Sequence, residues 1–271
     1  MNLNVLKYKI TKRIIWLFGD KKYKSYSDAL KDCISNGYEN NAIIELVTEK
    51  RALSQKKALN GALPHAESLS IFPLISLINA LSKDKTKLNV VDFGGADGGH
   101  YLFTRQVLNK DIALNWEVVE TPEMSKAMQA FATDELSYSD DLDKTLAAMP
   151  KIDILHTSGT LQCTPNPYEF LEKMINLGAE YLIFNRQSLN LNDYDMITIQ
   201  RSLLSWHGSN DFSVQFKDCA INYPHTNMSI KKFESMVQEK YDTLYTYEDT
   251  SGVKKVQNEK MIGKSYVSKK K

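Results

Sequence analysis

The amino-acid sequence predicts an α/β protein with a doubly wound, Rossmann-like sheet that is mostly parallel and ends in an antiparallel strand. Three observations predict it. From residue 88 onward short apolar runs alternate with helical segments, a glycine-rich loop follows the first run, and two strand-like runs near the C-terminus are close enough to pair antiparallel. Strands that alternate with helices imply right-handed crossovers, which give a parallel sheet covered on both faces.

Residues 1–85 are expected to form an N-terminal helical region that serves as a cap or an interface. Ser25 and Asp28 have the spacing of a capping box, with Asp in place of the usual Glu, and Gly37 follows as a C-terminal stop. Two further helices are predicted over 42–59 and 69–81, the second with Pro73 near its first turn. A polar connector then leads into a second domain over 86–271.

The second domain is expected to alternate strands with helices and then to change character. Its predicted strands lie at 88–93, 116–120, 136–138, 152–157 and 181–184, and its helices begin near Tyr101, Pro122 and Tyr168. Residues 185–223 are polar and rich in aromatic residues, and they interrupt the alternation. A helix over 230–240 and two strands over 244–247 and 262–267 complete the chain.

Charge and composition exclude several classes of protein. The 271 residues include 34 basic and 33 acidic side chains, for a net charge of +1. Residues 1–24 and 254–271 each carry +6, whereas the body between them carries −11, so we expect no nucleic-acid partner. No apolar run approaches the roughly 18 residues of a membrane span. Without a signal peptide, and with three scattered cysteines, the chain is expected to be cytoplasmic and to hold neither disulfide nor metal.

An acid followed by a glycine loop stands at the end of the first predicted strand. Asp92 ends this strand, and the loop after it contains Gly94, Gly95, Ala96 and Gly98. Because glycine has no Cβ, the backbone of such a loop can approach a ligand closely.

Acids also end the next two predicted strands. At the end of the second, Glu120 can accept both hydroxyls of a ribose, and the adjoining Thr121 forms a corner that could wall an adenine. Asp140 and Asp141 follow the third strand, where an acid can accept a hydrogen bond from an adenine amino group. The acids at the ends of three successive strands have the positions expected for residues that bind an adenosyl ligand at the topological switch point of the sheet.

The acids favour S-adenosyl-L-methionine (SAM) as the cofactor, because SAM carries a sulfonium and an ammonium group. A dinucleotide stays an alternative, since Gly94-x-Ala96-x-x-Gly99 nearly matches the dinucleotide fingerprint and would make the protein an NAD-dependent oxidoreductase. Asp92 and the antiparallel end of the sheet weigh against it. There are two further alternatives. The glycine loop can form a tight turn without binding a ligand, or the protein can be a scaffold that keeps the fold without catalysis.

Several of these residues resemble a family of class I SAM-dependent methyltransferases encoded in bacterial gene clusters for surface polysaccharide (capsule or lipopolysaccharide) biosynthesis. The similar segments are Phe18-Gly19, Tyr26, Ala29, Ser35-Asn36-Gly37-Tyr38, Asp92-Phe93-Gly94-Gly95-Ala96, Gly98, Trp116-Glu117-Val118-Val119-Glu120, Ser158-Gly159-Thr160-Leu161-Gln162, Pro167-Tyr168, Arg186, Gln200 and Tyr223-Pro224. The resemblance implies O-methylation of a glycan, a nucleotide-sugar or a phosphate-containing intermediate, with residues at about 186–225 as an insertion on the acceptor side. The family has an Asp-Arg pair after the fifth strand where this chain has Asn185-Arg186, so a carboxylate base is missing there.

Four histidines compete for the role of a general base, which O-methylation of a hydroxyl can use. His207 is favoured because it lies in the long stretch over the sheet. His100 stands beside the glycine loop at a helix N-terminus, where it could instead make a loop or cap contact. His156 lies inside a buried strand and reads as a core histidine, and His225 follows Tyr223-Pro224.

Other side chains are candidates for binding the acceptor or the cofactor. Arg186 is expected at a strand end, where its guanidinium could bind a phosphate or carboxylate of the acceptor and take part in catalysis. The alternative is a surface ion pair. Gln162, Tyr168 and Tyr223 are expected to line the acceptor site, and Ser158 to contact the methionine end of SAM.

The basic termini lie outside this predicted site. Residues 7–13, beside the apolar residues 14–18, can form an amphipathic helix that contacts an anionic membrane surface, packs on its own domain or joins a homodimer. The tail at 269–271 is expected to be disordered and solvated.

Overall fold

The computed structural model describes residues 3–18, 20–33, 40–61, 68–208, 216–248, 254–256 and 259–271. Gly37, the expected helix stop, lies outside these residues, as do Gly19 and the Ser35–Tyr38 segment. The helices are α1 (Leu3–Phe18), α2 (Tyr26–Lys31), α3 (Asn41–Leu59), α4 (Ser68–Leu81), α5 (Gly99–Val107), α6 (Pro122–Met128), α7 (Leu142–Ala148), α8 (Pro167–Asn176) and α9 (Ile230–Gln238), with 3₁₀ turns η2 (Gln129–Phe131), η3 (Leu161–Cys163) and η4 (Leu204–Trp206). The strands are β1 (Lys87–Phe93), β2 (Ala113–Val119), β3 (Leu136–Ser139), β4 (Ile154–Ser158), β5 (Tyr181–Asn190), β6 (Met196–Leu203), β7 (Ala220–Ser229), β8 (Tyr241–Glu248), β9 (Lys254–Val256) and β10 (Glu259–Lys270).

The main sheet has the strand order β3-β2-β1-β4-β5-β10-β8. The strands from β3 to β5 are parallel, whereas β10 runs antiparallel to both of its neighbours, β5 and β8. This is the arrangement of the Rossmann-like class I methyltransferase sheet. The fold class predicted from the sequence is therefore confirmed, including the antiparallel pair at its end.

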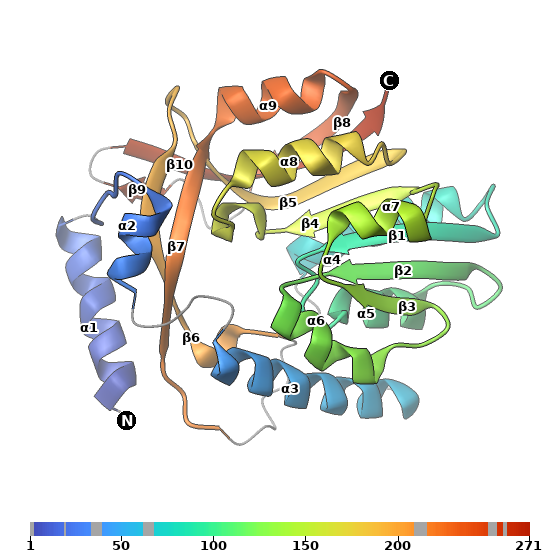
Figure 1. Ribbon diagram of the computed structural model, residues 1–271, viewed down its shortest axis with the longest axis horizontal. Helices are drawn as coiled ribbons and strands as arrows, with labels where there is room; N and C mark the ends of the chain where they lie inside the picture. The colour runs from blue at the N-terminus through green and yellow to red at the C-terminus, as the bar shows by residue number, and fades with distance from the viewer. Residues whose placement is uncertain are drawn as a thin grey trace.

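Helices cover both faces of this sheet. Successive side chains of a strand point to opposite faces, so apolar residues along a parallel strand need packing partners on both sides. In β1, Val90 packs in one apolar cluster with Ile78 of α4, whereas Val91 packs in the opposite cluster with Leu171 of α8. Figure 1 shows α7, α8 and α9 along one side of the strands. Residues of α3, α5 and α6 belong to the cluster of Val90. The N-terminal helices α3 and α4 thus share a core with the sheet.

Local sequence accounts for several helix boundaries. The Ser25 hydroxyl accepts a hydrogen bond from the backbone N–H of Asp28 at 3.1 Å, so the predicted cap of α2 is confirmed. Helices α3 and α4 match the predicted segments 42–59 and 69–81 to within one residue. Pro73 lies within α4, in its second turn.

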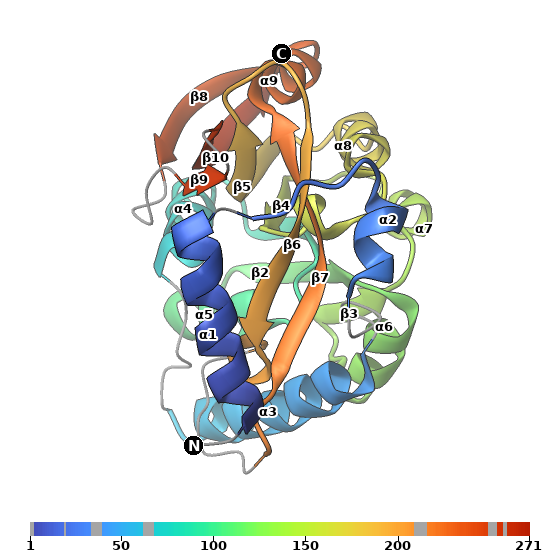
Figure 2. The same ribbon diagram turned by 90° about the vertical axis from the view of Figure 1, so that its left-hand side faces the viewer.

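The stretch predicted as irregular contains regular structure. Strand β5 continues to Asn190, and β6 and β7 form an antiparallel pair that we call the arm. The arm meets the sheet where Leu189 and Asn190 of β5 pair with the end of β7. Figure 2 shows the arm standing across the sheet, with α1 and α2 on its outer side and α3 near its far end. All residues of both strands are at least partly buried, without strict alternation, so the arm has no simple period in its polar sequence.

The C-terminal residues are ordered, which corrects the expectation of a disordered tail, and residues 269–271 are exposed to solvent as expected. Lys269 and Lys270 belong to β10 and pair with residues of β8, and the backbone N–H of Lys271 donates to the carbonyl of Lys240 at 3.1 Å. The tail is held because β10 is an internal strand with partners on both sides. Among the described residues, no helix has the length and apolar character needed to cross a membrane.

Candidate functional site

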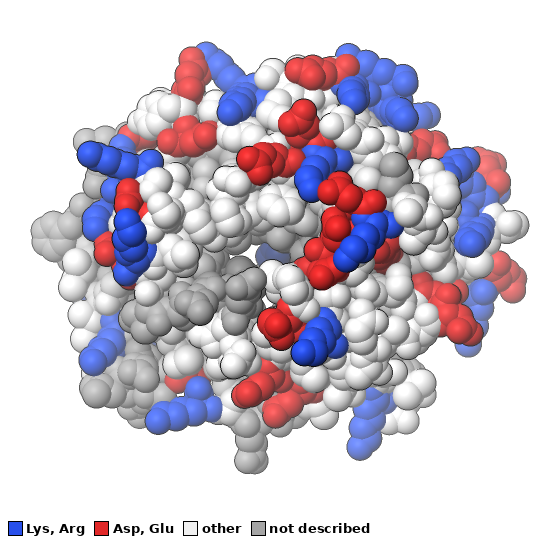
Figure 3. Space-filling model, in the orientation of Figure 1, with Lys and Arg blue, Asp and Glu red and all other residues white. Residues whose placement is uncertain are grey.

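The carboxyl ends of β1, β2, β4 and β5 point toward the arm, and the surface is hollowed between them (Figures 1 and 3). Figure 3 shows this hollow near the centre of the molecule, with acidic side chains on the side of the sheet. Open α/β sheets bind ligands at this edge. The predicted cofactor residues follow β1, β2, β3 and β4 and so belong to this region.

The glycine loop between β1 and α5 is closely packed by the protein itself. Gly94 has a φ of 73°, and a Cβ at this position would lie 2.0 Å from the Thr160 hydroxyl oxygen. A Cβ on Gly95 would lie 2.5 Å from a carboxylate oxygen of Asp92. Gly98 has a φ of 72° and approaches the Tyr138 hydroxyl in the same way. Neighbouring side chains therefore require glycine at all three positions, and a positive φ adds to this requirement at Gly94 and Gly98.

Glu120 connects the end of β2 to this loop. Its Oε1 accepts a hydrogen bond from the backbone N–H of Ala96 at 2.9 Å, and its Oε2 accepts one from the backbone N–H of Thr121 at 3.0 Å. Ala96 has a φ of 48°, an uncommon conformation for a residue with a side chain. Burial raises the pKa of Glu120, and the nearby charges of Asp92 and Asp97 add to this effect. The carboxylate holds the loop in place and keeps lone pairs for a ligand.

The acids after β3 are less enclosed. Asp140 is exposed and forms an ion pair with Lys144 at 3.2 Å. Asp141 is the N-cap of α7, where its Oδ1 accepts a hydrogen bond from the backbone N–H of Asp143 at 2.9 Å. Both acids therefore have roles in helix α7 apart from any contact with a ligand.

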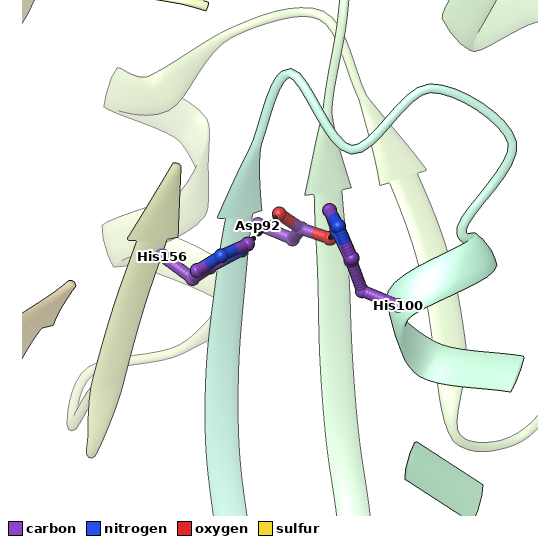
Figure 4. A group of neighbouring side chains, drawn as sticks. All are labelled: Asp92, His100 and His156. Atoms are coloured by element: carbon purple, nitrogen blue, oxygen red, sulfur yellow. Dashed lines mark hydrogen bonds and ion pairs between the residues drawn. The ribbon is translucent and has the colours of Figure 1, made fainter. Parts of the chain in front are cut away.

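Asp92 lies between two histidines, as Figure 4 shows. Its Oδ2 accepts a hydrogen bond from Nδ1 of His100 at 2.9 Å, and its Oδ1 accepts one from Nδ1 of His156 at 2.8 Å. Asp92 and His156 are fully buried, whereas His100 is one-fifth exposed. These three residues have potential metal-ligating atoms within 4.8 Å of one another. The two imidazole rings also contact each other edge-on, with 4.7 Å between their centroids, so hydrogen bonds and ring packing together hold the three side chains in place.

The hydrogen bonds continue across the sheet from His156. Its Nε2 accepts from Nδ2 of Asn185 at 2.9 Å, and Oδ1 of Asn185 accepts from the Tyr247 hydroxyl at 2.6 Å. His156 is thereby fixed as a neutral ring with its proton on Nδ1. His100 differs, because its Nε2 forms no hydrogen bond within the described part of the chain.

Charges within this group set its protonation. Burial acts to raise the pKa of Asp92, but the charge of His100 and the hydrogen bonds from His100 and His156 hold it well below its usual range. Burial acts to lower the pKa of His100, but the charge and hydrogen bond of Asp92 raise it overall. For His156 burial prevails and lowers the pKa. The group is therefore an ionised carboxylate with one basic imidazole and one neutral imidazole.

Arg186 lies within β5, two residues past the predicted strand end at 184, which corrects the expectation that it emerges at a strand end. Its conformation is strained, with a φ of 54°. Its Nε donates to the Ser158 hydroxyl at 3.0 Å, and its carbonyl accepts from Nε2 of Gln162 at 3.0 Å. The hydroxyl of Ser265 fixes its backbone N–H at 2.9 Å. Three predicted residues, Ser158, Gln162 and Arg186, are thus brought together.

The structure places the other predicted residues farther from this group. The Tyr168 hydroxyl donates to Asp195 at 2.5 Å, and the ring lines a separate pocket of about 270 Å³ beside Tyr26 and Pro167. Tyr223 is buried in the apolar core, with its ring centre 6.3 Å from that of His207.

His207, the histidine favoured from the sequence as a general base, is buried near α3. Its Nε2 hydrogen-bonds the Ser202 hydroxyl at 2.9 Å, and its carbonyl accepts from Lys50 at 2.7 Å. Burial and the charge of Lys50 lower the pKa of His207 to about 4. The neutral ring is a packed part of the arm.

Sequence reasoning interpreted His156 as a core histidine and did not connect it to Asp92. The two residues are direct partners in the parallel register of β1 and β4. Their shared position near the ends of neighbouring strands is the signal that could have joined them. Asn185 and Tyr247 have no comparable signal in the sequence.

No family model and no curated protein matches this chain. Among solved structures, the N-terminal domain of EvdMO1, crystallised in the presence of SAH and D-fucose, is similar at 9% identity over 82% of this chain and 97% of that chain, with a TM-score of 0.47. CalS10, an amino pentose methyltransferase from Micromonospora echinaspora, is 10% identical over 80% and 96%, with a TM-score of 0.47. A SAM-dependent methyltransferase from Clostridium acetobutylicum ATCC 824 is 11% identical over 82% and 98%, with a TM-score of 0.43. Matches at this level do not assign an activity to the chain.

Proposed function

We propose that this protein is a SAM-dependent methyltransferase that methylates an oxygen atom of a small-molecule acceptor. The observation that carries the proposal is the class I strand order combined with a glycine loop that Glu120 holds between the ends of β1 and β2. Acids at both strand ends suit a cofactor with two positive groups and would repel the pyrophosphate of a dinucleotide. The methyltransferase is therefore favoured over an NAD-dependent oxidoreductase.

Two orphaned polar atoms fit a ligand across these strand ends. The Thr121 hydroxyl, after β2, and Oε1 of Gln162, after β4, are buried and have no hydrogen-bond partner among the described residues. Buried polar atoms are normally hydrogen-bonded, so a polar ligand between them would supply what both lack. The residues present fit SAM in this respect.

Each predicted cofactor residue has a role in this proposal. Glu120 would accept the ribose hydroxyls, the backbone of residues 94–98 would lie along the ligand, and Ser158 would meet the methionine end. The oxygen of Asp141 that does not cap α7 would accept from the adenine amino group, with Asp140 beside it. Asp92 differs, because both of its oxygens already accept hydrogen bonds from histidines.

We assign the general base to His100. SAM supplies a methyl carbon activated by a sulfonium, and a hydroxyl that receives this methyl group must lose its proton. Nε2 of His100 can take the proton, while Asp92 keeps Nδ1 protonated and stabilises the imidazolium that forms. Arg186, next to Ser158, would orient a phosphate or carboxylate of the acceptor.

The resemblance stated above extends the proposal to the acceptor. We propose a glycan, a nucleotide-sugar or a phosphate-containing intermediate of surface-polysaccharide biosynthesis as the acceptor, and the cytoplasm as the place of the reaction. Gln162, Tyr168 and Tyr223 stay candidates for contact with it. Gln162 is the one that lies against Arg186.

Binding of the cofactor is tested by isothermal titration with SAM and its demethylated product. The wild-type protein should bind both, and Glu120→Gln should weaken binding about tenfold or more, because it removes a charged acceptor. Glu123→Gln, an exposed change in the first turn of α6, is the matched control and should bind as the wild type does. Unchanged binding by the Glu120 variant, or binding of NAD by the wild type, would refute the assignment.

The acceptor is tested separately by mass spectrometry of surface glycans from a strain that lacks the gene. We expect a glycan species lighter by the mass of one methyl group. An unchanged glycan would refute the polysaccharide acceptor without affecting the result on SAM binding. An intact SAM site without turnover on any glycan intermediate would identify a non-catalytic scaffold.

A further inference from the structure

The described side chains of helix α1 include a buried tyrosine on one side and exposed apolar residues on the other. Tyr8 is buried, and its ring meets that of Trp206 edge-on with 5.8 Å between the centroids. Figure 2 shows α1 along the outer side of the arm, with its opposite side turned away from the rest of the chain. The helix is therefore anchored on the arm through one face while the other meets solvent.

The solvent face carries a continuous apolar stripe. Leu6, Ile10 and Ile14 are 37%, 52% and 51% exposed. Residues four apart lie above one another on a helix, so these three side chains form one row along the axis. A row of exposed leucine and isoleucine on a helix is a binding surface that lacks its partner.

The charged side chains that α1 itself places beside this row are all positive. Lys7 and Arg13 flank it on its two sides at 100° per residue, and Lys9 lies next to Arg13. All three are exposed, and none forms an ion pair with any residue that the structure describes. Helix α1 contains no acidic residue. By contrast, Lys21 and Lys31, a short distance along the chain, are both paired with aspartates.

We propose that α1 binds the surface of an anionic lipid membrane. Leu6, Ile10 and Ile14 lie at the boundary between headgroups and acyl chains, and the three basic side chains contact lipid phosphates and carboxylates. An apolar row between unpaired cations is the pattern of helices that lie in the membrane interface. Helix α1 lies on the bilayer and does not cross it.

A second copy of the chain fits this surface less well. A symmetric dimer brings the same patch of both subunits together, so the basic residues of one copy would lie against the basic residues of the other. An acidic protein groove would match the charges. It is an outcome that the experiment distinguishes from lipid.

The test is co-sedimentation of the full chain with vesicles of phosphatidylcholine, with and without phosphatidylserine. Binding is expected only to vesicles with phosphatidylserine and should weaken as salt is added. Each basic residue near an anionic surface contributes about fivefold, so the triple variant K7Q/K9Q/R13Q should bind about 100-fold more weakly. The variant I10S/I14S should bind about tenfold more weakly, because it exposes no apolar row to the bilayer.

Matched controls come from the end of α3, which also has exposed apolar and basic residues. Leu59 is 81% exposed, and Lys56 and Lys57 lie in the same last turn. Leu59→Ser and K56Q/K57Q should bind vesicles as the wild type does. Circular dichroism and titration with SAM establish that each variant is folded and keeps its cofactor site, so this result is independent of the proposed activity.

Four outcomes would overturn the proposal. Equal binding to both kinds of vesicle would show that the charges are not used. Unchanged binding by I10S/I14S would show that the apolar row is not used. A wild-type dimer that I10S/I14S converts to a monomer, without lipid binding by either, would identify a second copy as the occupant, and absent lipid binding by a wild-type monomer would leave an acidic protein as the partner.

Discussion

His207→Gln is expected to remove an acid-sensitive part of the protein's stability. His207 is 6% exposed at the end of η4, and its pKa falls from the usual 6.5 to about 4, first because of burial and then because of the charge of Lys50. Below about pH 6.5 the unfolded chain therefore binds a proton at this residue that the folded chain does not. Stability is complete above this pH and is lost as the pH falls toward the folded value.

The size of the effect follows from these two pKa values. Proton linkage gives a loss of about 2 kcal/mol in the free energy of unfolding between about pH 7.5 and pH 5. The loss approaches about 3 kcal/mol near pH 4. Gln keeps a polar group near the Ser202 hydroxyl, to which His207 is hydrogen-bonded, but it cannot bind the proton.

The assay is urea unfolding, followed by circular dichroism, of the wild type and the variant at both pH values. Every other titrating group contributes equally to both proteins. The difference between the two losses in the free energy of unfolding therefore isolates the contribution of His207. The wild type should lose about 2 kcal/mol more than the variant between the two pH values. Equal losses would refute the reasoning. Retained methyl transfer by the variant would agree with a structural role, whereas its abolition would restore His207 as a candidate base.

Further predictions concern the group around Asp92 and the glycine loop. Activity should rise with pH as the His100 base loses its proton, with a midpoint above pH 6.5. Asp92→Asn should move the midpoint of kcat/KM to lower pH, because it removes the charge that raises the pKa of His100. An unchanged midpoint would contradict the roles proposed for Asp92 and His100. Tyr247→Phe should cost about 1 kcal/mol in urea unfolding, because its partner amide on β5 loses a 2.6 Å hydrogen bond, and an unchanged midpoint of unfolding would contradict this. Gly98→Ala should destabilise the fold by about 1–3 kcal/mol through its positive φ and the Tyr138 hydroxyl 2.8 Å from the new Cβ. Gly61→Ala is the matched control, because Gly61 has a φ of 77° and a new Cβ there would have nothing within 4 Å. It measures the destabilisation that comes from the positive φ alone, which should be smaller than that of Gly98→Ala.

The sequence predicted the sheet and its flanking helices because their signals are local. Apolar runs with glycine and polar breaks mark the strands from residue 88 onward, and Ser25 with Asp28 marks the start of α2. The arm escaped prediction, since its polar and aromatic residues alternate less visibly and its strands pair over a connection of more than ten residues. The C-terminal lysines were misjudged because their order comes from β5 and β8, on both sides of β10.

The residues of the candidate site also differ in how well the sequence predicted them. The acid and glycines of the loop could be found from spacing, because they lie within a few residues of one another and their backbone conformation is local. The sequence favoured His207 over His100 as the base, because burial against α3 and availability of a ring nitrogen depend on segments far along the chain. The surroundings of the two residues reverse this preference in the proposed function.

By itself the sequence determined which segments form strands and helices, where the glycine loop lies and which acids end the strands. Only the tertiary structure decided that Asp92 holds two histidines. Its partner His156 is 64 residues away along the chain and reaches Asp92 through the register of two parallel strands. A shift of that register by one residue would turn His156 to the opposite face of the sheet. Register is fixed by the packing of both faces together, which no local stretch of sequence contains.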